Sequence, residues 1–158
     1  MESQSLPALV EDALRIHENA LANCQIRVMR KFDPAPNILA DRHKILQILV
    51  NLIANAKHAL TESTAKERLL TLTVGTAGED TVRVAVADNG IGILRENLTR
   101  IFTHGFTTRP DGHGFGLHSG ALAAKEMGGN LSVHSEGRGQ GATFTLELPL
   151  QKKLVENQ

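Results

Sequence analysis

Two asparagines four residues apart are the residues of this chain whose type and spacing most directly suggest chemistry. They are Asn51 and Asn55, within the segment DRHKILQILVNLIANAKHAL of residues 41–60. If this segment is a helix, the two amides lie on one face, one turn apart. Asparagine is a poorer helix former than alanine or lysine, so its repeated use in so apolar a run costs helix propensity. The amides either form a hydrated helix surface or point into a polar pocket, where they bind a ligand or a metal ion.

The rest of that segment predicts how the asparagines are positioned. Asp41 is suited to cap the first turn of a helix. Lys44, Gln47 and His58 extend the polar stripe to which the asparagines belong. Apolar residues at spacings of three and four predict a buried helix face, made up of Ile45, Leu49, Leu52, Ile53, Ala56 and Leu60.

Three glycine-rich segments further along the chain could also take part in binding. They are residues 88–92 (DNGIG), 112–116 (GHGFG) and 139–144 (GQGATF). Each is a weak signal alone, because glycines after a strand usually form turns. None has the strand-to-helix context of a dinucleotide fingerprint, and the sequence contains no GxxxxGK[ST] loop. We therefore do not expect a Rossmann or P-loop site.

Length and composition predict a single domain, residues 1–158. A hydrophobic content of 41% and a charged content of 22% are typical of a globular chain. The 17 basic and 17 acidic residues give a formal charge of zero, which argues against a nucleic-acid binder. A lone cysteine, Cys24, excludes a disulfide framework and fits a reducing cytoplasm. No apolar run is long enough to cross a bilayer, and residues 1–7 lack the features of a signal peptide, so we expect no direct membrane contact.

The periodicity of apolar residues predicts the surrounding elements. We expect helices at 7–23, 41–60, 94–102 and 117–127, strands at 25–32, 70–74, 82–86, 130–135 and 142–148, an extended piece at 37–40 and a polar tail at 151–158. Residues 103–116 show no apolar periodicity and predict a long functional loop. Together these elements predict an α+β fold, a two-layer α/β sandwich in which helices cover one face of a mixed, mostly antiparallel sheet of about five strands.

Taken in order, these segments resemble the ATP-binding catalytic domain of bacterial sensor histidine kinases. That family belongs to a superfamily with gyrase, Hsp90 and MutL that shares the Bergerat ATP-binding fold. NLIANAKHAL is similar to the family's N box, VADNGIGI to its first glycine box, IFTHGFTT to its F box, GHGFGLH to its second glycine box and GQGATFTLELP to its closing strand motif. The resemblance covers about residues 25–150 and does not include the predicted N-terminal helix, within residues 1–24. It implies that the chain binds ATP and Mg²⁺.

The resemblance assigns roles to residues of the first two boxes. Asp88 matches the acid that accepts a hydrogen bond from the exocyclic amine of adenine. Gly90 and Gly92 would let the backbone approach the purine, and Ile93 would contact the nucleotide beside them. Asn55 matches the magnesium ligand. Because Mg²⁺ takes most of its remaining ligands from water and phosphate, one neutral protein ligand can be enough.

The resemblance also implies an ATP lid at residues 101–116. Asn51, His58, Arg100 and Arg109 form the predicted catalytic set, with the basic members contacting phosphate. Phe102 and Phe106 would anchor the lid by packing, or are simply core residues. Besides Asn51 and His58, the predicted nucleotide-binding residues of this region and of the closing strand are Phe102, Thr107, Thr108, Arg109, Gly112, His113, Gly114, Phe115, Gly116, Leu117 and Thr143.

Asn51 occupies the position at which gyrase-like members of the superfamily carry a glutamate that activates water. An amide cannot act as a general base at neutral pH, so we expect a kinase rather than a hydrolase. The resemblance implies transfer of the γ-phosphate to a histidine on a separate dimerisation and phosphoacceptor domain, and indirectly to a response regulator. This chain would then be a monomeric, cytoplasmic catalytic domain with no activity toward histidine without that partner. It would belong either to a soluble kinase or, as the cytosolic part, to a membrane-bound sensor.

Two alternatives stay open at this point. Serine kinases of the anti-sigma-factor and mitochondrial dehydrogenase-kinase types share the same boxes. A nucleotide-sensing interaction module would bind ATP without transferring its phosphate. His17 lies next to Glu18, but residues 1–24 offer a single short helix rather than the helical hairpin that carries the phosphoacceptor histidine in the family.

Overall fold

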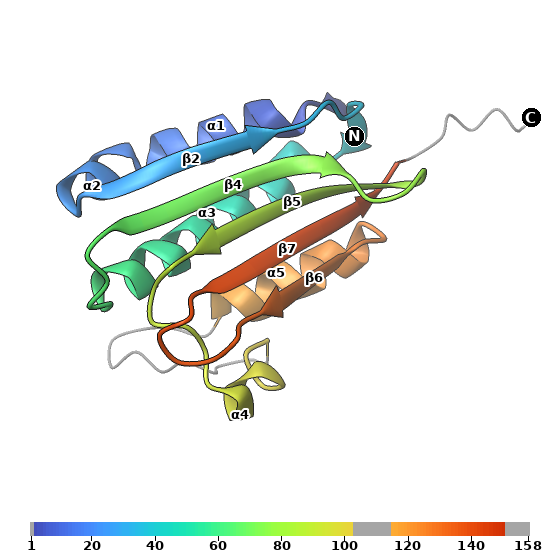
Figure 1. The fold of residues 1–158 in the computed structure, drawn as a ribbon. Coiled ribbons are helices and arrows are strands. Elements are labelled where there is room, and N and C mark those ends of the chain that lie inside the picture. The colour runs from blue at the N-terminus through green and yellow to red at the C-terminus, as the bar shows by residue number, and fades with distance from the viewer. Residues whose placement is uncertain (1, 103–114, 151–158) are drawn as a thin grey trace, which may run out of the picture.

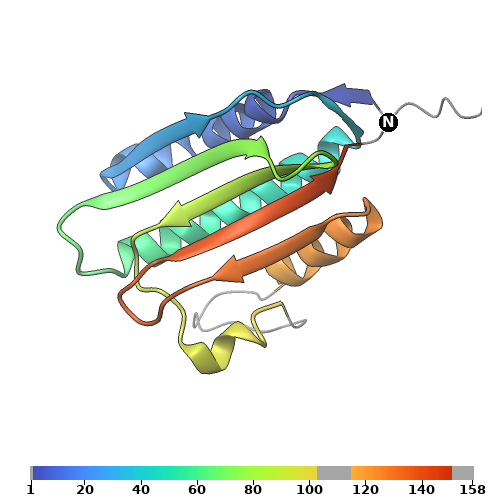
Figure 2. The same cartoon turned by 45° about the vertical axis from the view of Figure 1, so that its right-hand side comes forward.

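A mixed sheet of five strands forms one layer of the molecule. The computed structural model describes residues 2–102 and 115–150. The sheet has the strand order β2-β4-β5-β7-β6 (Figures 1 and 2). Its strands are β2 (Ile26–Phe32), β4 (Arg68–Thr76), β5 (Thr81–Asp88), β7 (Ala142–Pro149) and β6 (Asn130–His134). β2 and β4 are parallel, and the other neighbouring pairs are antiparallel.

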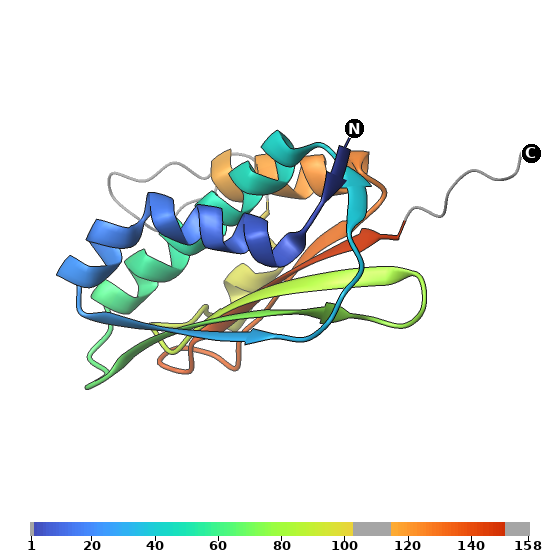
Figure 3. The same cartoon turned by 90° about the horizontal axis from the view of Figure 1, so that it is seen from above.

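Helices form the second layer. α1 (Leu6–Ile16), α3 (Arg42–Thr61) and α5 (Phe115–Glu126) all lie on the same face of the sheet (Figure 3). The core between the layers joins the apolar face of α3 to alternate residues of the central strands, among them Leu72, Val84 and Leu146, which are at most 1% exposed. The predicted two-layer α+β sandwich, with helices on one face of a mostly antiparallel sheet, is confirmed.

Helix α3 forms as its sequence predicts. The Asp41 carboxylate accepts hydrogen bonds from the backbone N–H groups of His43 and Lys44 and so caps the first turn. All six residues of the predicted apolar face are buried, each at most 2% exposed. Ile48 is buried as well, which places the helix deeper than an amphipathic surface helix. The polar stripe therefore lies beside the core and is partly covered by it.

The prediction of one continuous helix at 7–23 is wrong, because the helix is interrupted at His17. α1 ends at Ile16, and α2 (Glu18–Asn23) begins after a residue with φ −100° and ψ 9°. The His17 backbone N–H donates to Leu14 O, three residues back, which tightens the last turn of α1. The His17 ring is held by tertiary contact, since its Nε2 lies 3.0 Å from Val50 O on α3.

Several other boundaries differ from the expected ones. A short strand that the sequence did not suggest, β1 (Glu2–Gln4), pairs antiparallel with β3 (Ile38–Ala40), the expected extended piece, in a separate two-stranded sheet. The predicted helix at 94–102 is only α4 (Arg95–Leu98), and α5 begins at Phe115 rather than at 117. In the part of the chain that the structure describes, no helix is both long and apolar enough to span a bilayer.

Candidate functional site

Asp88 ends strand β5 on the side that faces the helices. It continues the alternation of Val82, Val84 and Val86, which are buried beneath the helical layer. Its Oδ1 accepts a hydrogen bond of 2.8 Å from the Gly90 N–H. Burial raises the pKa of Asp88 to about 6, while hydrogen bonds from the backbone of Gly90 and Ala142 act in the opposite direction. At neutral pH the group is therefore an oriented, poorly hydrated carboxylate, suited to accept a hydrogen bond from a ligand.

The loop that follows Asp88, residues 88–93, is joined to the β6–β7 turn, residues 135–141; we call the two the loop pair. Gly139 N–H donates to Ile91 O over 2.6 Å, and Gly141 N–H donates to Gly90 O over 3.2 Å. The contact is close enough to require glycine. A Cβ on Gly92, where φ is +75°, would lie 2.1 Å from Gly137 O, and one on Gly141, where φ is +71°, would lie 2.1 Å from Asp88 O.

Contact with helix α3 explains why residue 90 is a glycine. A Cβ at this position would lie 2.6 Å from Ala59 O, the carbonyl to which the Ile91 N–H donates over 3.2 Å. Gly90 and Gly92 therefore have a reason to be glycine that lies within the protein, whereas the sequence suggested only a close approach to a purine. Their effect is to hold the Asp88 loop against both α3 and the β6–β7 turn.

Two residues that position this loop were missed by sequence reasoning. Ser135 is buried, and its hydroxyl accepts a hydrogen bond of 3.0 Å from the Ile93 N–H and donates one of 2.6 Å to Gly141 O. Asn89 fastens the other side, because its Oδ1 accepts from the Leu69 N–H and its Nδ2 donates to Glu67 O, each over 2.8 Å. A serine or asparagine at a strand end beside glycines is a signal for such side-chain-to-backbone bonds.

The polar stripe of α3 runs past this loop. Ala59 touches the loop at Gly90, and two turns earlier the Asn51 side chain lies against Gly116, where an added Cβ would be 3.4 Å from the Asn51 amide. Asn55 is one turn, about 6 Å, from each of these contacts. The structure thus brings Asn51, Asn55 and the start of α5 together with the Asp88 loop. Neither asparagine side chain forms a hydrogen bond with residues 2–102 or 115–150, and both are half-buried.

His58 lies on the same side of α3, one turn beyond Asn55. Its Nε2 is 3.1 Å from Glu62 Oε2, and the side chain is 30% exposed. The Nε2 atom itself is buried and has no well-formed hydrogen bond to any described residue, so the contact with Glu62 has poor directionality. A basic side chain here would gain from an anionic partner with better geometry.

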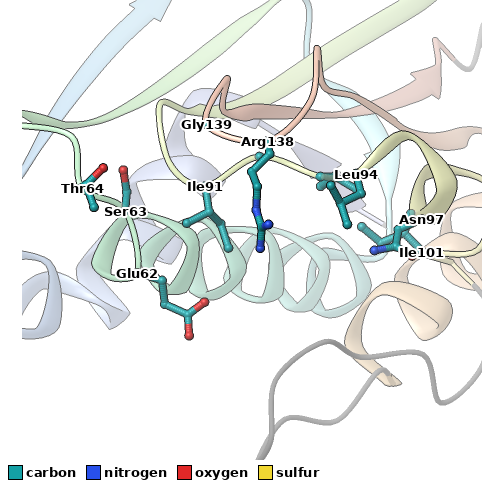
Figure 4. A pocket seen from close by; sticks show the side chains of 11 residues that line it. Glu62, Ser63, Thr64, Ile91, Leu94, Asn97, Ile101, Arg138 and Gly139 are labelled. Atoms are coloured by element: carbon teal, nitrogen blue, oxygen red, sulfur yellow. The ribbon is translucent and has the colours of Figure 1, made fainter.

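A pocket of about 670 Å³ opens at the C-terminal end of α3 (Figure 4). One wall is the Asp88 loop and the β6–β7 turn, from which Arg138 extends toward α3, and another is the segment after α3. This volume is in the range of small-molecule sites. The pocket is lined by Glu62, Ser63, Thr64, Ile91, Gly92, Ile93, Leu94, Asn97, Ile101, Arg138 and Gly139.

Phe102, at the start of the predicted lid, is anchored in the core. The Phe102 ring packs edge-on against Phe144, with ring centroids 6.3 Å apart and an interplanar angle of 83°. Its carbonyl oxygen lies 3.0 Å from Nδ1 of His118 on α5. Leu117, also on α5, packs against the core. Arg100 is exposed just before the anchor, and its Nη2 donates to Asn97 Oδ1 over 3.2 Å.

Thr143 is one predicted site residue that the structure does not bring to this side. On β7 the buried residues alternate as Ala142, Phe144 and Leu146 and face the helices, so Thr143 points to the opposite face of the sheet. Ala142 is the residue paired with Asp88. The predicted contacts that lie outside the described residues are those of Phe106, Thr107, Thr108, Arg109, Gly112, His113 and Gly114, together with the side chain of Phe115.

Comparisons with known proteins agree with this arrangement. Residues 40–152 match the family model described as histidine kinase-, DNA gyrase B-, and HSP90-like ATPase. The chain is 33% identical to the sensor histidine kinase ZraS of Klebsiella oxytoca over 158 residues, which are 99% of this chain and 33% of that protein. It is 33% identical to the sensor protein FixL of Bradyrhizobium diazoefficiens over 147 residues, 92% of this chain and 28% of that protein. The chain thus spans about a third of the length of these relatives.

Solved structures show the same fold. The catalytic domain of the histidine kinase ThkA, in a nucleotide-free form, superposes with a TM-score of 0.82 at 27% identity, covering 95% of this chain and 97% of that one. Full-length ShkA in complex with AMPPNP superposes with a TM-score of 0.84 at 29% identity, covering 96% of this chain and 31% of that one. The matched family model covers more than half of the chain, so this protein belongs to the histidine kinase-, DNA gyrase B- and HSP90-like ATPase family, in which it is similar to the catalytic domains of sensor histidine kinases.

Proposed function

We propose that this domain binds Mg-ATP and transfers the γ-phosphate to a histidine on a separate phosphoacceptor domain. The observation that carries the proposal is the oriented Asp88 carboxylate, held by the loop pair next to the polar stripe of α3 that contains Asn51 and Asn55. The carboxylate suits the exocyclic amine of adenine, and the amide stripe then runs toward the phosphates. The ShkA structure is described as a complex with AMPPNP, which supports an adenine nucleotide as the ligand.

The donor set of the stripe fits magnesium that is bound mainly through the nucleotide. Among the described residues, no group of three or more His, Cys, Asp or Glu side chains could hold a metal ion by itself. Asn55 offers a neutral amide oxygen, the kind of ligand that suffices when phosphate and water supply the rest. Bound there, Mg²⁺ would neutralise phosphate charge.

The residues of this chain bind and orient the nucleotide but supply no nucleophile. Asn51 is an amide and cannot take a proton from water, which disfavours hydrolysis. Phosphoryl transfer depends mainly on positioning and on charge neutralisation, so the acceptor histidine can come from another domain. His58 and Arg100 would contact the phosphates, as would Arg109 of the predicted lid. The expected partner is a helical dimerisation and phosphoacceptor domain of the same kinase, with a response regulator acting after it, and the expected location is cytoplasmic.

Reconstitution tests this proposal. The domain is incubated with γ-³²P-ATP, Mg²⁺ and the phosphoacceptor domain of its own kinase, and with a control acceptor whose histidine is replaced by glutamine. We expect label on the histidine-bearing acceptor only, lost on acid treatment because phosphohistidine is acid-labile. Acid-stable label would instead indicate a serine kinase of the anti-sigma-factor type. ATP binding without any label would indicate a nucleotide-sensing module, and rapid ATP hydrolysis without an acceptor would contradict the reading of Asn51.

A further inference from the structure

The Ser135 hydroxyl uses its whole hydrogen-bonding capacity inside the protein. A hydroxyl can donate one hydrogen bond and accept two. Ser135 Oγ donates to Gly141 O over 2.6 Å, and it accepts from the N–H groups of Ile93, over 3.0 Å, and Gly137, over 3.3 Å. The residue is 9% exposed, so water cannot readily replace these bonds. Such a saturated, buried hydroxyl holds two backbone segments at a fixed separation.

The bonds of Ser135 close a chain that begins at the Asp88 carboxylate. Asp88 Oδ1 accepts from Gly90 N–H over 2.8 Å. The carbonyl of the same Gly90 accepts from Gly141 N–H over 3.2 Å. The carbonyl of Gly141 then accepts from Ser135, whose hydroxyl accepts from the Ile93 N–H, five residues after Asp88. The path leaves the Asp88 loop, crosses the turn and returns to the loop.

The polypeptide on this path cannot easily compensate for a missing hydroxyl. The backbones of Asp88 and Gly141 are already in a contact that leaves no room for a β-carbon. Without the hydroxyl, the buried Gly141 carbonyl and the part-buried Ile93 N–H would lose their partner, and the two segments would separate to admit water. Separation would release the Gly90 N–H that fixes the direction of the carboxylate.

We infer that Ser135 is a positioning residue for nucleotide recognition, which acts through Gly141 and Gly90 to aim the Asp88 carboxylate at the base. The inference rests on the proposed contact between Asp88 and the adenine amine. It extends the site to the β6–β7 turn, on a residue that does not itself touch the ligand. Loss of the hydroxyl should therefore weaken recognition of the amine and leave binding of the rest of the nucleotide intact.

Two nucleotides separate this role from a general structural one. Equilibrium binding of ATP and of purine riboside triphosphate, which lacks the exocyclic amine, is measured on wild type, Ser135→Ala and Ser132→Ala. Ser132 is an exposed serine on β6, three residues before Ser135, and serves as the matched control. For Ser135→Ala we expect ATP affinity to fall about five- to tenfold, as for a lost hydrogen bond, with less than about a twofold change for the analogue. Ser132→Ala should change neither.

The ratio of the two affinities is the decisive quantity, because any unfolded fraction lowers both apparent affinities equally and cancels. An unchanged ratio in Ser135→Ala, whether both affinities fall or neither does, would overturn the inference. Asp88→Asn tests the underlying contact separately. If that variant keeps the wild-type ratio, the proposed adenine contact is wrong; if it collapses the ratio while Ser135→Ala does not, only the role of Ser135 is wrong.

Discussion

The two ends of the candidate site are built in different ways. The loop pair is fastened by backbone hydrogen bonds and by contacts that only glycine permits, and its buried Ser135 has a partner for each of its bonding positions. The polar stripe of α3, formed by Asn51, Asn55 and His58, rests on a rigid helix, but its polar atoms are not committed to other described residues in good geometry. Under the proposed function, the group that selects the base is fixed before the ligand arrives, whereas the groups that meet phosphate and metal keep their bonding capacity for the ligand.

The largest expected effect is on the stability of the loop pair. Gly141→Ala should destabilise the fold by about 2–4 kcal/mol, because the new Cβ meets Asp88 O at 2.1 Å in a backbone with φ of +71°. Gly78→Ala is the control, since Gly78 has a similar φ of +80° but open space around it. It should lose only about 1 kcal/mol. Urea unfolding of both variants measures the difference, and equal losses would show that the close contact adds nothing.

The next effect is on the ligand. Asp88→Asn should weaken ATP binding by roughly ten- to a hundredfold, the range for losing a charge-assisted hydrogen bond. Glu79→Gln removes an exposed carboxylate in the turn at the far end of β5 and should have no effect. Isothermal titration with ATP checks both variants. Unchanged affinity in Asp88→Asn would remove the base-recognition role from this end of the site.

A smaller effect is expected at the polar stripe of α3. Asn55→Ala should lower ATP affinity about tenfold in the presence of Mg²⁺ and leave it unchanged in EDTA, because only the metal ligand is lost. Gln47→Ala, an exposed residue on the same helix, is the matched control. The two titrations, with and without Mg²⁺, give the comparison directly. A loss of the same size in EDTA would show that Asn55 contacts the nucleotide itself.

The smallest expected effect is a pH dependence. As pH rises, the contribution of Asp88 to the stability of the fold should fall, whereas the affinity for ATP should increase. The pKa of Asp88 is raised to about 6, above its ordinary value of 3.8, so the folded state favours the protonated form. The carboxyl of the ligand-free domain therefore contributes most to stability below pH 3.8, and this contribution is lost as pH rises through 6. ATP binding needs the ionised carboxylate and should weaken severalfold on going from about pH 7.5 to about pH 5.5.

Measuring both trends against Asp88→Asn isolates this one group from other titrating residues. In that variant the decline in ATP affinity between the two pH values should disappear. The extra stability at low pH that Asp88 gives the wild type should also be absent from this variant. A wild-type affinity that stays constant across this range would mean that the Asp88 carboxyl remains ionised, or takes no part in binding.

The helices and strands in which apolar residues recur at regular spacing could be predicted from the sequence. Helix α3 combines an N-cap, a regular apolar face and a length well beyond a strand, and it formed within a residue or two of its expected ends. The β4–β5 and β6–β7 hairpins follow from alternation with glycine turns between them. The break at His17 was not predictable, because residues 7–23 are locally helical and the ring contact with Val50 is made across 33 residues.

The site was partly predictable for the same reason. Asp88 and the asparagines lie in local motifs, and a helix or a strand end places them. The reason for the glycines is tertiary: each of Gly90, Gly92 and Gly141 is required by a carbonyl from another segment. Ser135 acts across 42 residues on Ile93, and a single sequence carries no mark of that pairing. Thr143 faces away from the helices, as its alternation with the buried Phe144 on β7 requires.

The short β1–β3 ribbon has a mechanical consequence. It lies at the end of the molecule where β7 also finishes, whereas the pocket is at the other end of the sheet (Figure 1). Strand β4, nine residues long, gives the length between these ends, about 30 Å. The ribbon is thus remote from the Asp88 loop, which lies at the pocket end of the sheet. Rotation of the domain by about 20° about this ribbon would move the Asp88 loop through about 10 Å, while residues beside the ribbon would move little.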